Sequence, residues 1–230
     1  MKAMLLAAGR GERLRPLTDR VPKALVEAGG KPLIVWHLER AAAAGCREIV
    51  INVSHLGERI VEHLGDGSRY GLRIAYSREA EPLETAGGIA QALPLLAAEP
   101  FLLVNADIYC ECDFAPLMRH ALGSSLAHLV LVPNPAHRPK GDFTLEGGLL
   151  RDGAQNAAPR YTYAGVAVVA PRLVAAVRPG ERAPLAPLLY AAAERGLLSG
   201  ELYRGRWQDV GTLERLDELE SWLATQNEDR

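Results

Sequence analysis

A glycine- and arginine-rich stretch near the N-terminus, residues 5–23, carries the residue types with the clearest chemical potential. Gly9 and Gly11 follow a short apolar run and let backbone N–H groups approach an anion closely. Five basic residues against two acidic ones give segment 10–23 a charge of about +3, although the whole chain carries −2. Arginine can hold two phosphate oxygens at once. The stretch therefore predicts a phosphate-binding loop, whose basic residues are Arg10, Arg13, Arg15, Arg20 and Lys23.

Two common nucleotide-binding motifs do not occur in the sequence. Gly9 and Gly11 begin like a dinucleotide fingerprint, but Leu14 stands where the third glycine would be. No Gly-x-x-x-x-Gly-Lys-Ser/Thr segment is present, which excludes a P-loop enzyme by motif. Phosphate binding must therefore come from a different arrangement of glycine and arginine.

A carboxylate follows the most apolar predicted strand. Phe101–Ala106 ends in Asp107, and a central parallel strand with an aspartate at its carboxyl end is a common way to present a metal ligand. The alternative is that Asp107 only forms the turn after the strand. Another aspartate, Asp209, lies shortly before the last predicted helix and could alternatively serve as a cap there.

The elements that must position these residues alternate between apolar strands and amphipathic helices. This alternation is typical of βαβ units, and hence of an α/β fold with a mainly parallel sheet and helices on both faces. Segment 79–88 is expected to be a loop whose Gly87 and Gly88 allow close approach of a flat ligand. We expect strands at 3–8, 48–54, 72–76, 101–107, 127–132 and 161–170, and helices at 32–44, 57–64, 89–97, 185–196 and 213–223.

Composition indicates a globular protein with small-molecule partners. The 230 residues, with 48% hydrophobic and 23% charged side chains, suit one large domain. No basic stripe with interleaved aromatic residues suggests a nucleic-acid partner, and no apolar run approaches the roughly 20 residues of a membrane span. The apolar start stops at Gly9 and is followed by dense charge, so it reads as a strand rather than a signal peptide. Three cysteines without zinc-like spacing are expected to be reduced cytoplasmic thiols.

The chain resembles the sugar-1-phosphate nucleotidylyltransferases over most of its length. The opening signature is Leu6-Ala7-Ala8-Gly9-x-Gly11-x-Arg13-Leu14, with Pro16-Leu17-Thr18 and Pro22-Lys23 behind it. The segments Asn105-Ala106-Asp107 and Trp207-Gln208-Asp209-Val210-Gly211-Thr212 fall where that family keeps its metal-binding acids. The resemblance implies a Rossmann-like fold of the nucleotide-diphospho-sugar transferase type with a small lid-like sugar-binding subdomain. One domain, 1–230, is expected, divided into a nucleotide-binding core at about 1–133, a sugar-binding part at about 134–212 and a C-terminal helix at 213–230.

The same resemblance implies a role for each site residue. Asp107 and Asp209 would hold Mg²⁺, Lys23 would bind the α-phosphate, and Arg13 would stabilise charge on the departing pyrophosphate. The implied nucleotide contacts are Leu6, Ala8, Gly9, Gly11, Glu81, Gly88 and Asn105. The implied sugar contacts are Glu84, Asp142 and Gly165. Glu81 and Glu84 could instead be charges that stabilise a helix N-terminus, and Arg10 and Arg15 could be solvated surface charges.

Within the family, the length and several segments most resemble the N-acetylmuramate-1-phosphate uridylyltransferases of peptidoglycan recycling; these segments are 82–88, 141–143 and 199–205. The expected substrates are therefore UTP and N-acetylmuramate α-1-phosphate, for a monomer or homodimer in the cytoplasm. Two alternatives stay open. One is a guanylyl- or thymidylyltransferase acting on mannose, heptose or glucose 1-phosphate, and the other is a non-catalytic homologue that senses nucleotide sugars.

Overall fold

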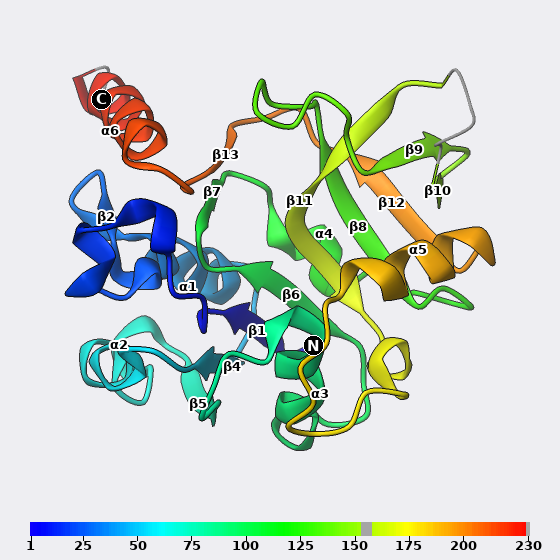
Figure 1. The fold of residues 1–230 in the computed structure, drawn as a ribbon, viewed down its shortest axis with the longest axis horizontal. Coiled ribbons are helices and arrows are strands. Elements are labelled where there is room, and N and C mark those ends of the chain that lie inside the picture. Colours follow the sequence, from blue (N-terminus) through cyan, green and yellow to red (C-terminus); the bar gives the residue numbers. More distant parts are fainter. Residues whose placement is uncertain (153–157, 229–230) are drawn as a thin grey trace.

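The computed structural model describes residues 1–152 and 158–228. A nine-stranded sheet runs through the molecule, and helices pack against both of its faces (Figure 1). In spatial order the strands are β5 (Arg73–Arg78), β4 (Glu48–Val53), β1 (Ala3–Leu6), β6 (Phe101–Asn105), β11 (Arg160–Val169), β8 (Ala127–Val132), β12 (Leu198–Leu202), β10 (Leu149–Arg151) and β9 (Phe143–Glu146).

Strand direction divides the sheet into two parts. β5, β4, β1 and β6 are parallel neighbours, so their carboxyl ends meet at one edge of the sheet. β11 runs antiparallel to both β6 and β8, whereas β12 is again parallel to β8. The fold is therefore α/β, as the sequence predicted, with a mixed sheet whose parallel pairings are β5–β4, β4–β1, β1–β6 and β8–β12.

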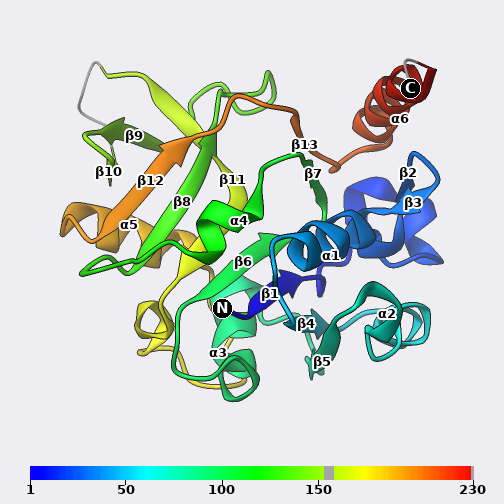
Figure 2. The same cartoon turned by 180° about the vertical axis from the view of Figure 1, so that it is seen from behind.

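Both faces of β4, β1 and β6 are buried, which explains their nearly continuous apolar sequences, whereas β5 at the edge of the sheet is partly exposed. Leu5 and Val104 belong to the core on the side of α1 (Leu33–Ala43), α2 (Gly57–Leu64) and α4 (Phe114–Met118). Met4 and Leu103, their neighbours in the chain, belong to the core on the side of α3 (Glu84–Leu96) and α5 (Ala186–Glu194). Figure 2 shows the side of the sheet that α1 and α4 cover.

The start of α3 corrects the expectation of a loop over segment 79–88. The helix begins at Glu84, so Gly87 and Gly88 lie in its first two turns rather than before it. A Cβ at Gly87 would lie 2.2 Å from the carbonyl oxygen of Glu181, and one at Gly88 would lie 2.7 Å from Glu79 Oε1. The glycine pair therefore serves close packing around the helix, which a sequence pattern cannot distinguish from a break in a helix.

Several short elements were not predicted. Between the strands predicted at 127–132 and 161–170, where no element was predicted, the structure has the antiparallel pair β9 and β10. A two-stranded ribbon joins β2 (Glu27–Ala28) to β3 (Lys31–Pro32), and another joins β7 (Ile108–Cys110) to β13 (Trp207–Asp209). The second ribbon matters for the site, because it brings a late segment of the chain beside the carboxyl end of β6.

The last helix, α6 (Leu213–Glu228), continues five residues beyond its predicted end, and residues 229–230 of the predicted C-terminal part lie outside the described chain. Its apolar side packs beside the β2–β3 ribbon, far along the sequence from α6 itself (Figure 1). The buried residues of this contact are Val26, Ala28, Leu33, Tyr109, Val210, Leu216, Leu219 and Leu223. Within residues 1–152 and 158–228, no helix has both the length and the apolar character needed to cross a membrane.

Candidate functional site

The phosphate-binding loop predicted at residues 5–23 leaves the carboxyl end of β1 and folds into three single 3₁₀ turns. Gly11 has a φ of 65°, and its carbonyl oxygen accepts hydrogen bonds from Leu14 N and Thr18 Oγ1, each at 2.8 Å. A Cβ at Gly11 would lie 2.9 Å from Thr18 Cγ2. The loop therefore closes tightly around a position that glycine alone fits, while Arg10 and Arg13 remain exposed.

A cavity of about 770 Å³ lies over this loop. It brings together most of the residues predicted for phosphate and metal binding, and it adds Arg182, which the sequence did not single out. Its lining residues are Gly9, Arg10, Gly11, Glu12, Arg13, Lys23, Glu81, Pro82, Asp107, Arg182 and Gly211.

Lys23 and Asp107 form an ion pair in this cavity. Lys23 Nζ lies 2.5 Å from Asp107 Oδ2, and the side chains are 11% and 39% exposed. Lys23 follows the buried Pro22 at the start of a 3₁₀ turn, and Asp107 follows β6 by two residues. The pair thus fixes the position of an ammonium group that is largely withdrawn from water but faces the cavity.

A smaller cavity of about 160 Å³ lies beside the first and is lined by three predicted nucleotide contacts, Leu6, Gly9 and Asn105. Gly165, a predicted sugar contact with a φ of 79°, lies against the amide group of Asn105. The pairing of β11 with β8 shifts register between Tyr163 and Ala167, which is where Gly165 lies. This irregularity brings β11 close to the end of β6.

A buried polar network that the sequence analysis missed ties the end of β1 to the start of α3. Asn52 Oδ1 accepts a hydrogen bond from Ala7 N at 2.8 Å, and Asn52 Nδ2 donates to Glu79 Oε1 at 2.7 Å. Glu79 Oε2 accepts from Leu83 N at 2.9 Å. Asn52 and Glu79 are 3% and 6% exposed, so these contacts satisfy polar groups that have lost water. Asn52 is a polar residue near the end of an otherwise apolar strand, and this feature of the sequence could have indicated the network.

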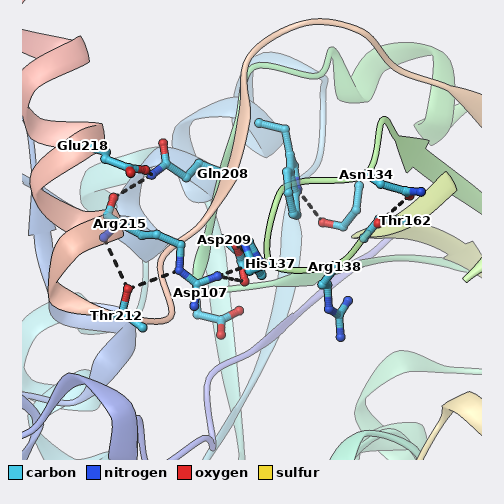
Figure 3. Close-up of polar contacts among 12 residues, drawn as sticks. Asp107, Asn134, His137, Arg138, Thr162, Gln208, Asp209, Thr212, Arg215 and Glu218 are labelled. Atoms are coloured by element: carbon cyan, nitrogen blue, oxygen red, sulfur yellow. Dashed lines mark hydrogen bonds and ion pairs between the residues drawn. The ribbon is translucent and has the colours of Figure 1, made fainter. Parts of the chain in front are cut away.

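Asp209 lies in β13 directly opposite Ile108, the first residue of β7, and Asp107 immediately precedes β7, so the two predicted metal ligands lie at the same end of one ribbon. Asp209 Oδ2 accepts a hydrogen bond from Arg215 Nη1 at 2.6 Å. His137 Nε2 approaches Asp209 Oδ1 to 3.0 Å, but Oδ1 is buried and makes no hydrogen bond to any described residue. Figure 3 shows Arg215 and His137 gathered at the Asp209 carboxylate.

The surroundings of Gly211 explain why the motif 207–212 has glycine at this position. A Cβ there would lie 2.4 Å from Arg215 Nη2 and 3.0 Å from Arg13 Nη2. Two guanidinium groups therefore pack against the bare backbone between Asp209 and Thr212. Arg13 also lines a second cavity of about 750 Å³, which includes Asp209 and Arg215, so it lies where the two large cavities meet.

The two predicted acidic contacts near the start of α3 behave differently. Glu81 is exposed and lines the main cavity. Glu84 has a φ of 60°, which is uncommon for a residue other than glycine, and its Oε1 pairs with Arg182 Nη2 at 2.9 Å. Ala183 O accepts hydrogen bonds from the backbone N–H groups of Ala86 and Gly87, so the segment carrying Arg182 is fastened to α3.

Five predicted contacts line none of these three cavities, namely Ala8, Glu84, Gly88, Asp142 and Gly165. Ala8 is buried, and Gly88 packs on Glu79 and Asn52. Asp142 accepts a hydrogen bond from Tyr163 N at 2.8 Å through Oδ2, while its carbonyl oxygen accepts one from Arg160 Nη2 at 2.7 Å. Asp142 is thereby bound to the backbone of β11, next to its register shift.

His37 of α1 supports the start of β7. Its Nε2 lies 2.8 Å from the carbonyl oxygen of Ile108, which can only accept, so this nitrogen carries the proton. Its Nδ1 is buried without a partner among the described residues. Burial lowers the pKa of His37 from 6.5 to about 4, and the ring is therefore neutral near pH 7.

Comparisons with known proteins identify the family of the chain. Residues 2–143 match the family described as nucleotidyl transferase. The chain is 50% identical over 227 residues to the N-acetylmuramate alpha-1-phosphate uridylyltransferase of Neisseria meningitidis serogroup B, covering 96% of this chain and 97% of that protein. It is 47% identical over 120 residues to a mannose-1-phosphate guanyltransferase of Schizosaccharomyces pombe, covering 51% of this chain and 33% of that protein.

A solved structure shares the fold at low sequence identity. The crystal structure of a putative glucose-1-phosphate thymidylyltransferase from Bacillus anthracis superposes with a TM-score of 0.85 at 18% identity, covering 97% of this chain and 95% of that one. The family match spans more than half of the chain, and the Neisseria relative is similar over nearly all of it. The chain therefore belongs to the nucleotidyl transferase family and is a nucleotidyltransferase.

Proposed function

We propose that the protein transfers the uridylyl group of UTP to N-acetylmuramate α-1-phosphate and releases pyrophosphate. The observation that carries the chemistry is a single cavity that contains both the arginine-rich loop and the Lys23–Asp107 pair. The choice of substrates rests on the 50% identity to a protein that carries this activity in its name, over 96% of the chain.

Each phosphate group meets positive charge in this arrangement. Arg13 and the backbone around Gly9 and Gly11 bind the β- and γ-phosphates, and Lys23 binds the α-phosphate. Leu6, Ala8, Asn105, Glu81 and Gly88 contact the nucleoside. Glu84, Asp142 and Gly165 contact the sugar. In this proposal, residues from 1 to about 133 form the nucleotide-binding core and residues from about 134 to 212 the sugar-binding part of one domain, which ends in the C-terminal helix α6 (Leu213–Glu228).

The reaction is a direct displacement at phosphorus. A phosphate oxygen of the sugar 1-phosphate forms a bond to the α-phosphorus of UTP, while the bond from that phosphorus to the bridging oxygen of pyrophosphate breaks. The attacking phosphate has a second pKa near ~6 and is already ionised at neutral pH, so no general base is needed. Lys23 stabilises charge on the α-phosphate in the transition state, and Arg13 stabilises the departing pyrophosphate.

Asp107 and Asp209 suit a role in holding Mg²⁺. Asp209 Oδ1 is buried and makes no hydrogen bond within the described chain, and the Lys23 contact of Asp107 uses only Oδ2. Oxygen atoms of one or two carboxylates, together with substrate phosphates, are the ligands that Mg²⁺ prefers. When bound, the ion would neutralise charge on the reacting phosphates.

The proposed setting is the recycling of peptidoglycan in the cytoplasm, by a monomer or homodimer whose partners are its small-molecule substrates rather than nucleic acid or membrane. The alternative substrates are GTP or dTTP with mannose, heptose or glucose 1-phosphate. The S. pombe relative supports this alternative, because it is named a mannose-1-phosphate guanyltransferase.

A pyrophosphate-release assay over a matrix of nucleoside triphosphates and sugar 1-phosphates tests the proposal. We expect the highest kcat/KM for UTP with N-acetylmuramate α-1-phosphate, and loss of activity in excess chelator. A higher kcat/KM for another pair of substrates would show that the proposed substrates are wrong but that the proposed reaction type is right. If no pair released pyrophosphate, the nucleotide-sugar-sensing alternative would replace the catalytic one.

A further inference from the structure

The Asp209 carboxylate is held on one side only. Arg215 donates from Nη1 to Asp209 Oδ2 at 2.6 Å, and the Arg215 side chain is 11% exposed. Asp209 Oδ1 is buried and makes no hydrogen bond to the described residues. The two oxygens of this carboxylate therefore differ, because one is anchored to a buried cation and the other is left with its lone pairs unpaired.

Arg215 is itself fixed from several directions. Its Nε donates to Thr212 Oγ1 at 3.3 Å, and its carbonyl oxygen accepts from Gln208 Nε2 at 2.7 Å. Gly211 leaves room for the guanidinium group, since a Cβ there would lie 2.4 Å from Nη2. These partners all come from the segment 208–212 that also carries Asp209, so ligand and anchor form one rigid unit at the start of α6 (Figure 3).

The contacts of His137 explain why Asp209 Oδ1 receives no hydrogen bond. Its Nε2 lies 2.7 Å from Arg215 Nη1 and 3.0 Å from Asp209 Oδ1. A guanidinium group only donates, so Nε2 accepts from Arg215 and has no proton to give to Asp209. Arg215 thus donates both to Asp209 Oδ2 and to His137 Nε2, so neither residue gives a proton to Asp209 Oδ1.

We propose that Arg215 is a positioning residue that restricts Asp209 to binding a metal ion through one oxygen, and thereby favours Mg²⁺ over Ca²⁺. This inference rests on the proposed role of Asp209 in holding the metal. Mg²⁺ requires near-octahedral geometry, which one carboxylate oxygen satisfies well, whereas Ca²⁺ accepts six to eight oxygens and bidentate carboxylates. A guanidinium group bonded to Oδ2 prevents the bidentate mode.

Direct metal binding tests the inference independently of activity. Electron paramagnetic resonance would follow Mn²⁺ binding to the protein in the presence of α,β-methylene-UTP, and Mg²⁺ or Ca²⁺ would then displace the Mn²⁺. In Arg215→Gln we expect Mg²⁺ affinity to fall about 10- to 100-fold, as for other groups that orient a metal ligand. Ca²⁺ affinity should fall less, because Asp209 gains its second oxygen, so the preference for Mg²⁺ over Ca²⁺ should decrease.

Two further variants separate positioning from simple charge or fold effects. Arg204→Gln removes an equal charge from the lining of the same 750 Å³ cavity without touching Asp209, and its preference for Mg²⁺ should equal that of the wild type. Arg215→Lys keeps the charge without the planar fork and should give an intermediate preference. Circular dichroism checks the fold, and the lysine variant carries the test if the glutamine variant does not fold.

The outcomes distinguish this inference from the function on which it rests. If wild type and Asp209→Asn bound Mn²⁺ with the analogue equally well, Asp209 would not be a metal ligand and the proposed metal site would be wrong. If Asp209→Asn lost Mn²⁺ but folded Arg215 variants kept the wild-type preference for Mg²⁺, the role of Arg215 alone would be overturned.

Discussion

Gly165 lies directly against the side-chain amide of Asn105, where an added Cβ would be 2.8 Å from Asn105 Nδ2. The two residues come from neighbouring antiparallel strands, β11 and β6, and meet where the register of β11 shifts. The contact joins a proposed sugar residue to a proposed nucleotide residue, so the backbone conformation of β11 sets the position of both.

Gly165→Ala should therefore both destabilise the protein and reduce its activity. The φ of 79° costs a residue with a side chain about 1–3 kcal/mol, and the new methyl group must also displace Asn105. Gly180→Ala is the matched control, because Gly180 has a φ of 82° but open space around it. Urea unfolding and kcat/KM for both variants would check this. Equal effects of the two substitutions on kcat/KM would argue against a role for the Asn105 contact.

The Lys23–Asp107 pair predicts a large catalytic effect from either residue. Lys23→Ala and Asp107→Asn should each lower kcat by at least ~100-fold without unfolding the protein, since Lys23 is proposed to stabilise charge on the α-phosphate and Asp107 to hold the Mg²⁺ that neutralises the reacting phosphates. Lys31→Ala is the control, because Lys31 forms a similar ion pair with Glu39 at 2.6 Å on the surface. Near-normal turnover in either site variant would remove that residue from the mechanism.

His37 predicts a loss of stability in acid. Its pKa is 6.5 in the unfolded chain and about 4 in the folded protein, so the unfolded state takes up the proton first as the pH falls. Stability is fully present above pH 6.5 and should decrease by about 3 kcal/mol between pH 6.5 and 4, because Nδ1 has no buried acceptor for a proton. Urea midpoints against pH should show a shallower decrease in His37→Gln, whereas the exposed His55→Gln should follow the wild type.

Asp142 allows a structural role to be separated from sugar binding. Asp142→Ala removes a charged acceptor from the backbone N–H of Tyr163 and should reduce the free energy of unfolding by about 1.5–3 kcal/mol. If Asp142 also contacts the sugar, as proposed, the KM for the sugar 1-phosphate should rise while the KM for the nucleotide changes little. An unchanged sugar KM in a destabilised variant would leave Asp142 with the structural role alone.

The sequence could predict those features that depend on contiguous residues. The loop after β1, the apolar strand before Asp107 and the motif around Asp209 are each local patterns, and they led to the fold class and to the lining of the main cavity. The predicted start of α3 was wrong because a glycine pair such as Gly87-Gly88 looks the same in the sequence in two situations. It can break a helix, or it can lie within a helix where another segment packs closely against it.

The remaining site residues depend on contacts across the fold. Arg182 reaches the main cavity because the segment containing it is bonded to α3, about a hundred positions earlier in the chain. Arg215 is one of many arginines in the sequence, and its contact with Asp209 depends on the turn of backbone at Gly211 and on the first turn of α6. His137 meets this pair from the loop after β8. No local sequence pattern predicts these contacts between residues that are far apart in the chain.

The order of the residues along the chain also constrains how the site is made. Asp107 belongs to the middle of the polypeptide, whereas Asp209 and Arg215 come near its end and reach Asp107 through the β7–β13 ribbon. A ribosome-bound chain that has completed the parallel half of the sheet still lacks this second carboxylate and its guanidinium anchor. The proposed metal site is therefore complete only when the chain has been synthesised through the start of α6, so a chain that ends before Asp209 has Asp107 but lacks the second carboxylate.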